Sequence, residues 1–434
     1  MKMNENNIFD EMEDEIRELH VTAKVSKEEK ADLLNACDDK RVIKYLVDQY
    51  NQSQQYRIRS QNQARALLQG VDESNEQQYT FIQKEIDNAS AQEALNKKYM
   101  DIVTDGIPVC RWMKSITGIG PCISAYLYAA FDVKVGTYNT NFLSYAGLND
   151  NNNPWLGTAK ANELTNKAIE YRSEKYDKIT NIIKSYCKDE KQFDKLVKAL
   201  PKKDFEISGV VNTINKITGV IILKDPDIDL GLICDWCMWM KNPKICDDIL
   251  IQYVSITTGR NFINVKKGVE NNWSKKANKT AKPTTDDLAS YLAKPPYNTE
   301  LKKRMFIISD MFVRNSNREK SLYGKIYKQK KLEFMQKNDK GFYAEQAKRI
   351  LESKNFSKDT NAYKALIEGR LPDAQINMRA RRYAVKLFIS HVFEAMYYAE
   401  FHEEPPKTYV IQFMGHHDYI APEVDYRPYI DGEL

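Results

Sequence analysis

Glycine and proline are scarce in this sequence, with 17 Gly and 14 Pro among 434 residues. Such low numbers argue against a protein built from many strands and tight turns, and against a glycine-rich dinucleotide-binding fold. A run of 18 apolar residues is also missing, which excludes a membrane-spanning helix. The acidic opening, MKMNENNIFDEMEDEIRELH, does not resemble a secretory signal or transit peptide. The sequence is instead rich in charged residues and tyrosine, and we predict a mainly α protein.

Cysteine is sparse as well, with 7 residues, an odd number without dense spacing. This pattern favours a reducing, cytoplasmic compartment over a disulfide-linked scaffold. Cys234 and Cys237 form a C-x2-C pair with Cys246 nearby, but no His or fourth Cys follows. Because a structural zinc site usually has four ligands, we expect buried free thiols, no metal and no cofactor.

Charge is distributed unevenly along the chain, although the total is only +5. Residues 1–40 carry a net −6, residues 301–386 carry 22 Lys and Arg against 9 Asp and Glu, and residues 387–434 carry a net −7. A basic block between two acidic ends is typical of a protein that binds a polyanion such as nucleic acid. Lysines solvated on helix surfaces are the alternative.

After an acidic segment, 1–29, residues 30–106 have the pattern of a helical arm. Apolar residues recur at helical spacing from Lys30 to Gln69, a break follows at Gly70–Ser74, and a second helix is expected over Glu76–Thr104. The second half of the first helix is nearly free of acids, so its polar face suits contact with a nucleic-acid backbone or with bases. A solvent-facing flank of a coiled coil is the alternative. The candidate contact residues are Arg57, Arg59 and Arg65.

Residues 107–160 contain two apolar helices joined by the turn Ile116–Pro121, the arrangement of a helix-hairpin-helix motif. Gly118 and Gly120 would let the backbone approach a phosphate, Pro121 suits the first turn of the next helix, and Lys114 and Thr117 would add donors. An ordinary corner between two core helices is the alternative.

The middle of the chain differs in composition from its flanks. Residues 161–204 predict a charged helix. Residues 205–298 contain β-branched runs and then the Lys/Thr/Pro-rich segment KKANKTAKPTTDD, from which we predict a small inserted subdomain of mixed structure followed by a linker.

Residues 299–402 predict basic helices. Arg379, Arg382 and Lys386 fall on one stripe of a helix expected over Asp373–Phe401, with Arg381 beside them, as phosphate contacts would. Tyr323 and Tyr327 alternate with Lys325 and Lys328, a pattern suited to stacking on single-stranded nucleic acid, unless both tyrosines pack in the core. The remaining candidates for RNA or DNA contact are Arg314, Arg318 and Asn377.

The C-terminal segment, 403–434, predicts an extended tail with one strand over Tyr409–Met414. Gly415–Asp418 contains His416 and His417, which with His391 form a possible tail site. No set of carboxylates frames a nuclease site, so a tail docked on the helical core is the favoured interpretation.

Three segments resemble known families. The run ITGIGPCISAYLYAAFDVKVGTYNTNFLSYAGL resembles the helix-hairpin-helix of the C-terminal domain of bridge-RNA-guided insertion-sequence transposases, and ELKKRMFIISDMFVRNSNREKSLYGKIYKQKK is similar to a later helix of that domain. The run INMRARRYAVKLFISHVFEAMYYAEFHEEPPKTYVIQFMGHHDYIAPE resembles a transposase subgroup that is itself similar to the Nop-domain proteins of TIGR-Tas systems and to box C/D Nop domains. Together these segments span about half the chain.

The sequence departs from the transposases in both parts of their chemistry. About 115 residues precede the hairpin and have a helical pattern, where the transposases carry a RuvC-like domain. No Ser follows Ala146-Gly147-Leu148, where their nucleophile stands, and Thr158 has no base nearby in sequence. The resemblance therefore points to nuclease-free, TasA-like Nop proteins.

That family implies a Nop-like helical core that binds a small structured guide RNA and recognises target DNA by base pairing to the guide. It also implies a prokaryotic or phage-encoded protein that pairs with a second copy through its helical arm. Alternatives stay open: a transposase or recombinase with an unrecognised site, in which Thr158 would be the nucleophile, an RNA scaffold that never contacts DNA, and a protein whose basic block binds an acidic protein.

Overall fold

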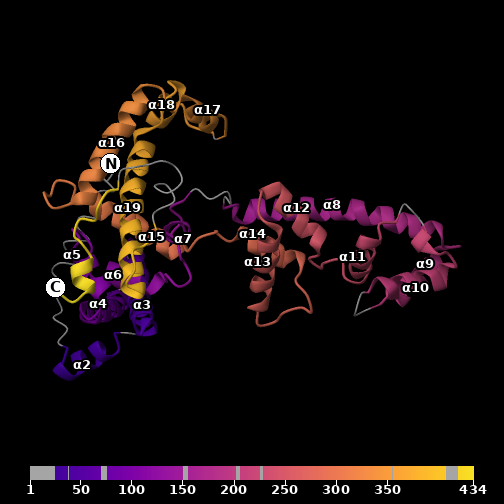
Figure 1. Ribbon diagram of the computed structural model, residues 1–434, viewed down its shortest axis with the longest axis horizontal. Coiled ribbons are helices and arrows are strands. Elements are labelled where there is room, and N and C mark those ends of the chain that lie inside the picture. Colours follow the sequence, from indigo (N-terminus) through magenta and orange to yellow (C-terminus); the bar gives the residue numbers. More distant parts are fainter. Residues whose placement is uncertain are drawn as a thin grey trace. The chain divides into compact units, whose positions relative to one another are not determined.

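The computed structural model describes residues 25–37, 39–69, 76–149, 155–201, 206–224, 228–353, 355–406 and 419–434. These residues form α-helices connected by short loops, with one isolated bridge between Ile245 and Thr284 and no β-strand among them (Figure 1). The prediction of a mainly α protein is confirmed. No helix in this described part is long and apolar enough to span a bilayer.

The chain divides into two compact units, one of residues 1–149 and 298–434 and the other of residues 150–297. We call them the main unit and the inserted unit. The inserted unit thus takes in the charged helix expected over 161–204 as well as the subdomain expected over 205–298. On either side of the insertion the two segments of the main unit are joined, because the Asn298 backbone N–H donates to the Tyr145 carbonyl over 2.9 Å.

The main unit begins with the helical arm. A single helix from Lys30 to Gln69 is wrong, because Ala36 ends one helix and the Asp39 carboxylate, which accepts the Arg41 N–H over 2.8 Å, begins the next. The hairpin itself is as predicted: α3 and α4 pack antiparallel, joined by contacts such as Tyr56 to Glu85. The helices of this part are α2 (Lys27–Asn35), α3 (Lys40–Gln69) and α4 (Glu76–Asp105).

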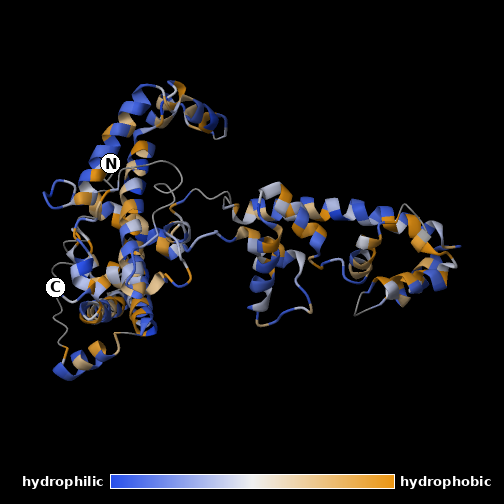
Figure 2. Ribbon diagram, in the orientation of Figure 1, coloured by the Kyte–Doolittle hydropathy of each residue, from blue (hydrophilic) through white to orange (hydrophobic). Residues whose placement is uncertain are grey.

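The core of the main unit forms where α19 packs against α5, α7, α15 and α16. Its largest buried side chains include Trp112, Phe312 and Phe388. Figure 1 shows α16 and α19 running beside each other, and Figure 2 shows hydrophilic and hydrophobic residues alternating along both, as in amphipathic helices. The remaining helices are α5 (Pro108–Ser115), α6 (Pro121–Ala130), α7 (Asn139–Tyr145), α15 (Thr299–Arg314), α16 (Leu322–Asp339), α17 (Ala344–Ser353), α18 (Asn361–Ile367), α19 (Asp373–Phe401) and α21 (Arg427–Ile430).

The inserted unit is helical, so the prediction of a mixed subdomain is wrong. The β-branched run at 210–214 forms the buried face of α10, because burial of Val210, Val211 and Ile214 outweighs their strand propensity. The segment predicted as a linker connects α13 to α14 inside the unit. Its helices are α8 (Gly157–Ser185), α9 (Glu190–Ala199), α10 (Ile207–Thr218), the 3-10 turn η2 (Ile222–Lys224), α11 (Leu230–Lys241), α12 (Asp248–Thr258), α13 (Phe262–Ser274) and α14 (Thr285–Ala293).

A buried polar cluster ties the long helix α8 to the loop before α12. The Arg172 guanidinium donates to the carbonyls of Ile245 and Pro243 over 2.7 and 2.8 Å and pairs with Asp247 at 3.3 Å. The Tyr176 hydroxyl donates to the same carboxylate over 3.1 Å. The donors of Arg172 and Tyr176 all bind the loop at residues 243–247, so this cluster holds α8 against the start of α12.

The described part of the C-terminal segment, 419–434, docks on the main unit, as the favoured interpretation predicts. The Trp112 indole N–H donates to the Val424 carbonyl over 2.7 Å, and the Trp112 and Tyr426 rings meet edge to face. The strand expected over Tyr409–Met414 and the His416 and His417 side chains lie outside the described residues.

Candidate nucleic-acid interface

The glycine turn between α5 and α6 forms as predicted, with Pro121 in the first position of α6, but one of its backbone donors already binds an anion. The Thr117 N–H donates to one Glu423 carboxylate oxygen over 2.8 Å, and the Leu322 N–H at the start of α16 donates to the other over 2.7 Å. Donors of this kind bind phosphate in other proteins. Here a carboxylate of the docked tail takes that place.

The other residues of the turn serve its geometry. Gly118 has a φ of +92°, and a Cβ atom there would lie 2.9 Å from the Asn315 amide nitrogen. Gly120 has extended backbone with open space around it. The Lys114 ammonium pairs with Asp101 at 2.7 Å and with Asp105 at 2.5 Å, which anchors α5 to α4. These contacts agree with the alternative interpretation, a corner between core helices.

The three arginines of the arm are placed differently. Arg57 is buried, and its guanidinium pairs with Glu93 of α4 at 2.8 Å and donates to Gln61, so it holds the hairpin together. Arg59 and Arg65 are exposed on α3. The homodimer expected through this arm stays a prediction.

The two tyrosines of α16 are core residues. Tyr323 is fully buried, and its hydroxyl donates to His391 Nδ1 over 2.8 Å, while His391 Nε2 donates to the Ile420 carbonyl over 2.8 Å. Burial lowers the pKa of His391 to about 4, so the ring is neutral and Nδ1 can accept. The Tyr327 hydroxyl donates to Asn377 Oδ1 over 2.6 Å. Neither ring has a free face for base stacking, so the core interpretation is correct.

The cationic stripe on α19 has the predicted spacing, with part of it packed against neighbouring helices. Arg379 lies over the Tyr343 ring, and Arg381 pairs with Asp310 of α15 at 3.1 Å. Arg382 is exposed and Lys386 is half-buried. The exposed end of the stripe is therefore the part suited to phosphate contact.

Exposed cations continue on the helices packed against α19. Lys325 and Lys328 point outward from α16, and Arg318 is exposed just before that helix. Arg314 pairs with Asp310, which thus binds two arginines. The exposed lysines of this block that make no ion pair with any described residue include Lys303, Lys320, Lys325 and Lys340. The surplus of positive charge between 301 and 386 is consequently carried at the surface.

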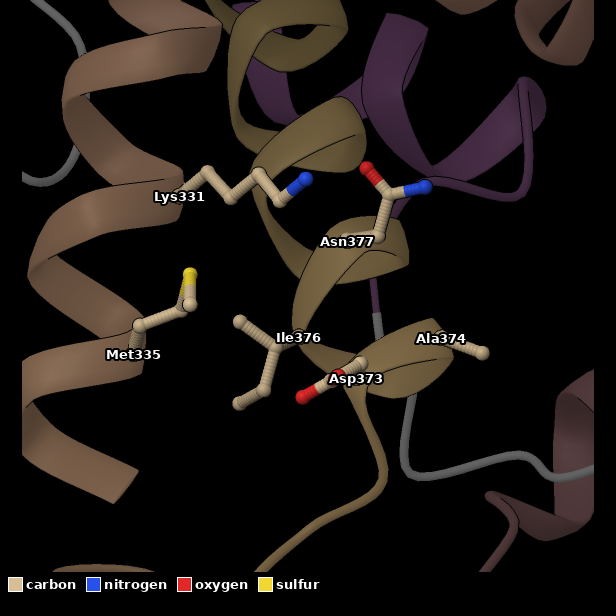
Figure 3. A pocket seen from close by; sticks show the side chains of 6 residues that line it. All are labelled: Lys331, Met335, Asp373, Ala374, Ile376 and Asn377. Carbon is tan, nitrogen blue, oxygen red and sulfur yellow. The ribbon is translucent and has the colours of Figure 1, made fainter. Parts of the chain in front are cut away.

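A pocket of about 270 Å³ opens in the same region, between α16 and the first turns of α19. Figure 3 shows Lys331 and Met335 projecting from α16 and Ile376 and Asp373 pointing back from α19, with Asn377 near the Lys331 ammonium. Of the residues that line this pocket, only Asn377 is among the candidates predicted from the sequence. The lining residues lie on two segments about 40 residues apart, and only the packing of α16 on α19 brings them together.

In the described part of the chain, no three His, Cys, Asp or Glu side chains are placed so that they could hold a metal ion. Cys234, Cys237 and Cys246 are free thiols, and burial raises the pKa of both Cys237 and Cys246 to about 12. The three belong to the core of the inserted unit or lie against it.

No family model matches the chain, and no curated protein or solved structure matches it.

Proposed function

We propose that the protein is a non-catalytic RNA-binding protein that holds a small structured guide RNA and uses it to recognise target DNA. The observation that carries the proposal is the surface of α15, α16, α19 and the loop before α16, where exposed lysines and arginines outnumber the acids that could neutralise them. Such a surface attracts a polyphosphate backbone and displaces its counterions. We call it the basic face, and define it by the exposed Lys303, Arg318, Lys320, Lys325, Lys328 and Arg382 and the half-buried Lys386.

RNA is the proposed ligand for two reasons. Residues 376–423, which include most of α19, resemble a transposase subgroup that is itself similar to Nop-type proteins of guide-RNA systems, and residues 116–148 and 300–331 resemble the C-terminal domain of bridge-RNA-guided transposases. In such systems the protein contacts shape and phosphates while base pairing supplies sequence specificity, which fits a cationic surface of helices. In this proposal the guide RNA, and not the protein, recognises the DNA sequence, through base pairing.

The direct test is to purify the full chain from its native locus context and sequence the nucleic acid that copurifies. We expect one discrete small RNA, and retention of a matching DNA that is lost after RNase treatment. DNA bound equally well after RNase treatment would favour the transposase-type alternative, and absence of nucleic acid would refute the proposal.

A charge-reversal variant tests the basic face. In a protein with Lys325→Glu, Lys328→Glu and Arg382→Glu, we expect RNA affinity to fall at least about tenfold and the slope of log affinity against log salt to shrink by about 2. Fluorescence anisotropy over a salt series measures both. The matched control reverses Lys160, Lys267 and Lys275, exposed in the inserted unit, with the same change in net charge. Equal losses in both variants would mean that net charge alone, without a defined face, binds the RNA.

A further inference from the structure

The pocket between α16 and α19 contains opposite charges that do not pair. Neither the Lys331 ammonium nor the Asp373 carboxylate makes a hydrogen bond or an ion pair with any described residue, although both line the same pocket. Elsewhere in the basic block the acids are used differently: Asp310 and Glu333 each pair with two cations. The pocket therefore presents a donor and an acceptor whose hydrogen-bonding capacity is open to a ligand.

Asn377 lines the pocket as well, but its amide is already engaged. Its Oδ1 accepts from the Tyr327 hydroxyl and lies on the side of Lys331, while the NH₂ group points away from Lys331 (Figure 3), which leaves the Lys331 ammonium as the donor of this set. Met335 and Ile376 supply apolar surface on opposite sides of the pocket (Figure 3). Apolar walls with a few convergent polar groups are the usual composition of a site for a small planar ligand.

The negative charge of Asp373 would repel a phosphate backbone. A carboxylate in a surface that binds polyphosphate is repelled by it, unless the carboxylate faces a donor edge of the nucleic acid instead. Asp373 is the first residue of α19, where its charge also favours the helix dipole. That position places the exposed carboxylate among the residues that line the pocket.

We propose that this pocket binds an unstacked guanine base of the RNA, a proposal that rests on the RNA-binding function above. A carboxylate has two acceptor oxygens and no donor. Guanine is the one standard base with two neighbouring donors, N1–H and the N2 amino group, on one edge, and its O6 acceptor stands beside them. Asp373 accepts from N1–H and N2–H, and Lys331 donates to O6.

The other bases leave this set partly unsatisfied. Adenine and cytosine present one donor beside an acceptor, and uracil presents one donor between two acceptors, so each would place an acceptor against an Asp373 oxygen. Each of these bases would lose one of the two hydrogen bonds to Asp373 and set two acceptors against each other, and the discrimination follows from that.

The test measures affinity for nine-residue oligouridines that carry guanosine, inosine or adenosine at the centre, at one salt concentration. We expect the wild-type full chain to prefer guanosine over adenosine at least about tenfold, as a bidentate base contact does. Inosine lacks the N2 amino group, so its affinity should lie between the two. In Asp373→Asn the preference should vanish while affinity for plain oligouridine stays equal or rises.

Glu345→Gln is the matched control. Glu345 is an exposed acid in the first turn of α17, within the same basic block and outside the pocket, so its removal changes charge and helix dipole in the same way. This variant should keep the guanosine preference. A second measurement needs no charge variant: 5′-GMP, and not 5′-AMP, should shift the methyl NMR resonance of Met335, assigned with Met335→Leu.

Equal affinity of the wild type for guanosine and adenosine oligomers would overturn the guanine pocket and leave the RNA-binding proposal standing. Loss of preference in Glu345→Gln would also overturn it, because the effect would then be one of charge alone. No binding to any oligomer, nor to the copurified RNA, would refute the pocket and the proposed function together.

Discussion

Two titratable side chains one turn apart on α19 lie beneath the docked tail with opposite pKa shifts. His391 accepts from Tyr323 and donates to Ile420, and burial lowers its pKa to about 4. Glu394 accepts from the Tyr419 hydroxyl over 2.9 Å, and burial raises its pKa to about 7. Both shifts favour the neutral form, so the tail rests on uncharged groups near pH 6.

Glu394→Gln should show how this burial depends on pH. The unfolded chain loses the Glu394 proton near pH 4.5 and the folded chain near pH 7, so this group stabilises the wild type below pH 4.5 and that contribution is lost as pH rises through 7. The variant has no such loss. We expect equal stability near pH 4.5 and a gain of about 2–3 kcal/mol for the variant at pH 8. Calorimetric unfolding across this range measures the difference, in which His391 cancels; a gain that does not depend on pH would contradict it.

The two glycines of the α5–α6 turn should respond differently to alanine. Gly118→Ala combines a left-handed φ with a contact of 2.9 Å to Asn315, whose amide donates to the Met311 carbonyl and is not free to move away. We expect a loss of about 2–3 kcal/mol. Gly120→Ala meets no atom within 4 Å and should cost less than about 1 kcal/mol as an N-cap change. Denaturant unfolding of both variants measures the two losses of stability. Equal losses would mean that the positive φ and the close contact at Gly118 do not destabilise an alanine there.

At the scale of helices, local signals predict local structure well. The hairpin α3–α4, the corner with Pro121 at the start of α6 and the helix from Asp373 to Phe401 all follow from periodicity and from glycine and proline positions. The break before α3 was missed because it depends on one carboxylate, Asp39, in a run without Gly or Pro. Strand propensity gives the wrong structure at 210–214, because burial against α9 and α11 stabilises a helix there.

The candidate site residues also divide into those that short-range patterns predict and those that depend on packing between distant segments. The exposure of Lys325, Lys328 and Arg382 follows from helical spacing. The core positions of Tyr323 and Tyr327 depend on α19 lying against α16, and no short-range pattern contains that information. The role of Glu423 was missed for the same reason, because its two donors, Thr117 and Leu322, are far from it in sequence.

Glu423 joins three elements, so its removal should release the tail. Glu423→Ala leaves the Thr117 and Leu322 N–H groups without their acceptor, which costs about 1–3 kcal/mol. We expect faster hydrogen exchange at residues 419–430 with α19 still protected. Glu433→Ala, an exposed acid of the same segment, is the control and should leave exchange unchanged. Unchanged exchange in Glu423→Ala would show that the other contacts of the tail, among them those of Trp112, His391 and Glu394, suffice to hold it.

Each unit has hydrophobic cores of its own. In the main unit one cluster surrounds Trp112 and Phe388 and a smaller one surrounds Leu366, and in the inserted unit two clusters surround Trp236 and Leu250. The proposed RNA contacts and the guanine pocket lie in the main unit. The inserted unit begins after Asn149 and ends before Asn298, whose side-chain amide also donates to the Tyr145 hydroxyl over 2.9 Å.

Replacing residues 150–297 by a short Gly/Ser linker should therefore leave the main unit folded. Closing a short loop between ends already in contact costs little entropy. We expect a single cooperative unfolding transition and RNA affinity within about threefold of the full chain, measured by calorimetry and anisotropy. A shortened chain that folds but no longer binds RNA would place part of the RNA contact in the inserted unit.

The bond between Asn298 and Tyr145 has a practical meaning for protein engineering. It closes the main chain on itself at one surface position, where a natural sequence of 148 residues already enters and leaves. A fluorescent reporter or an effector enzyme whose own termini are adjacent would meet the same geometry there. The position is therefore suited to the exchange of one inserted domain for another.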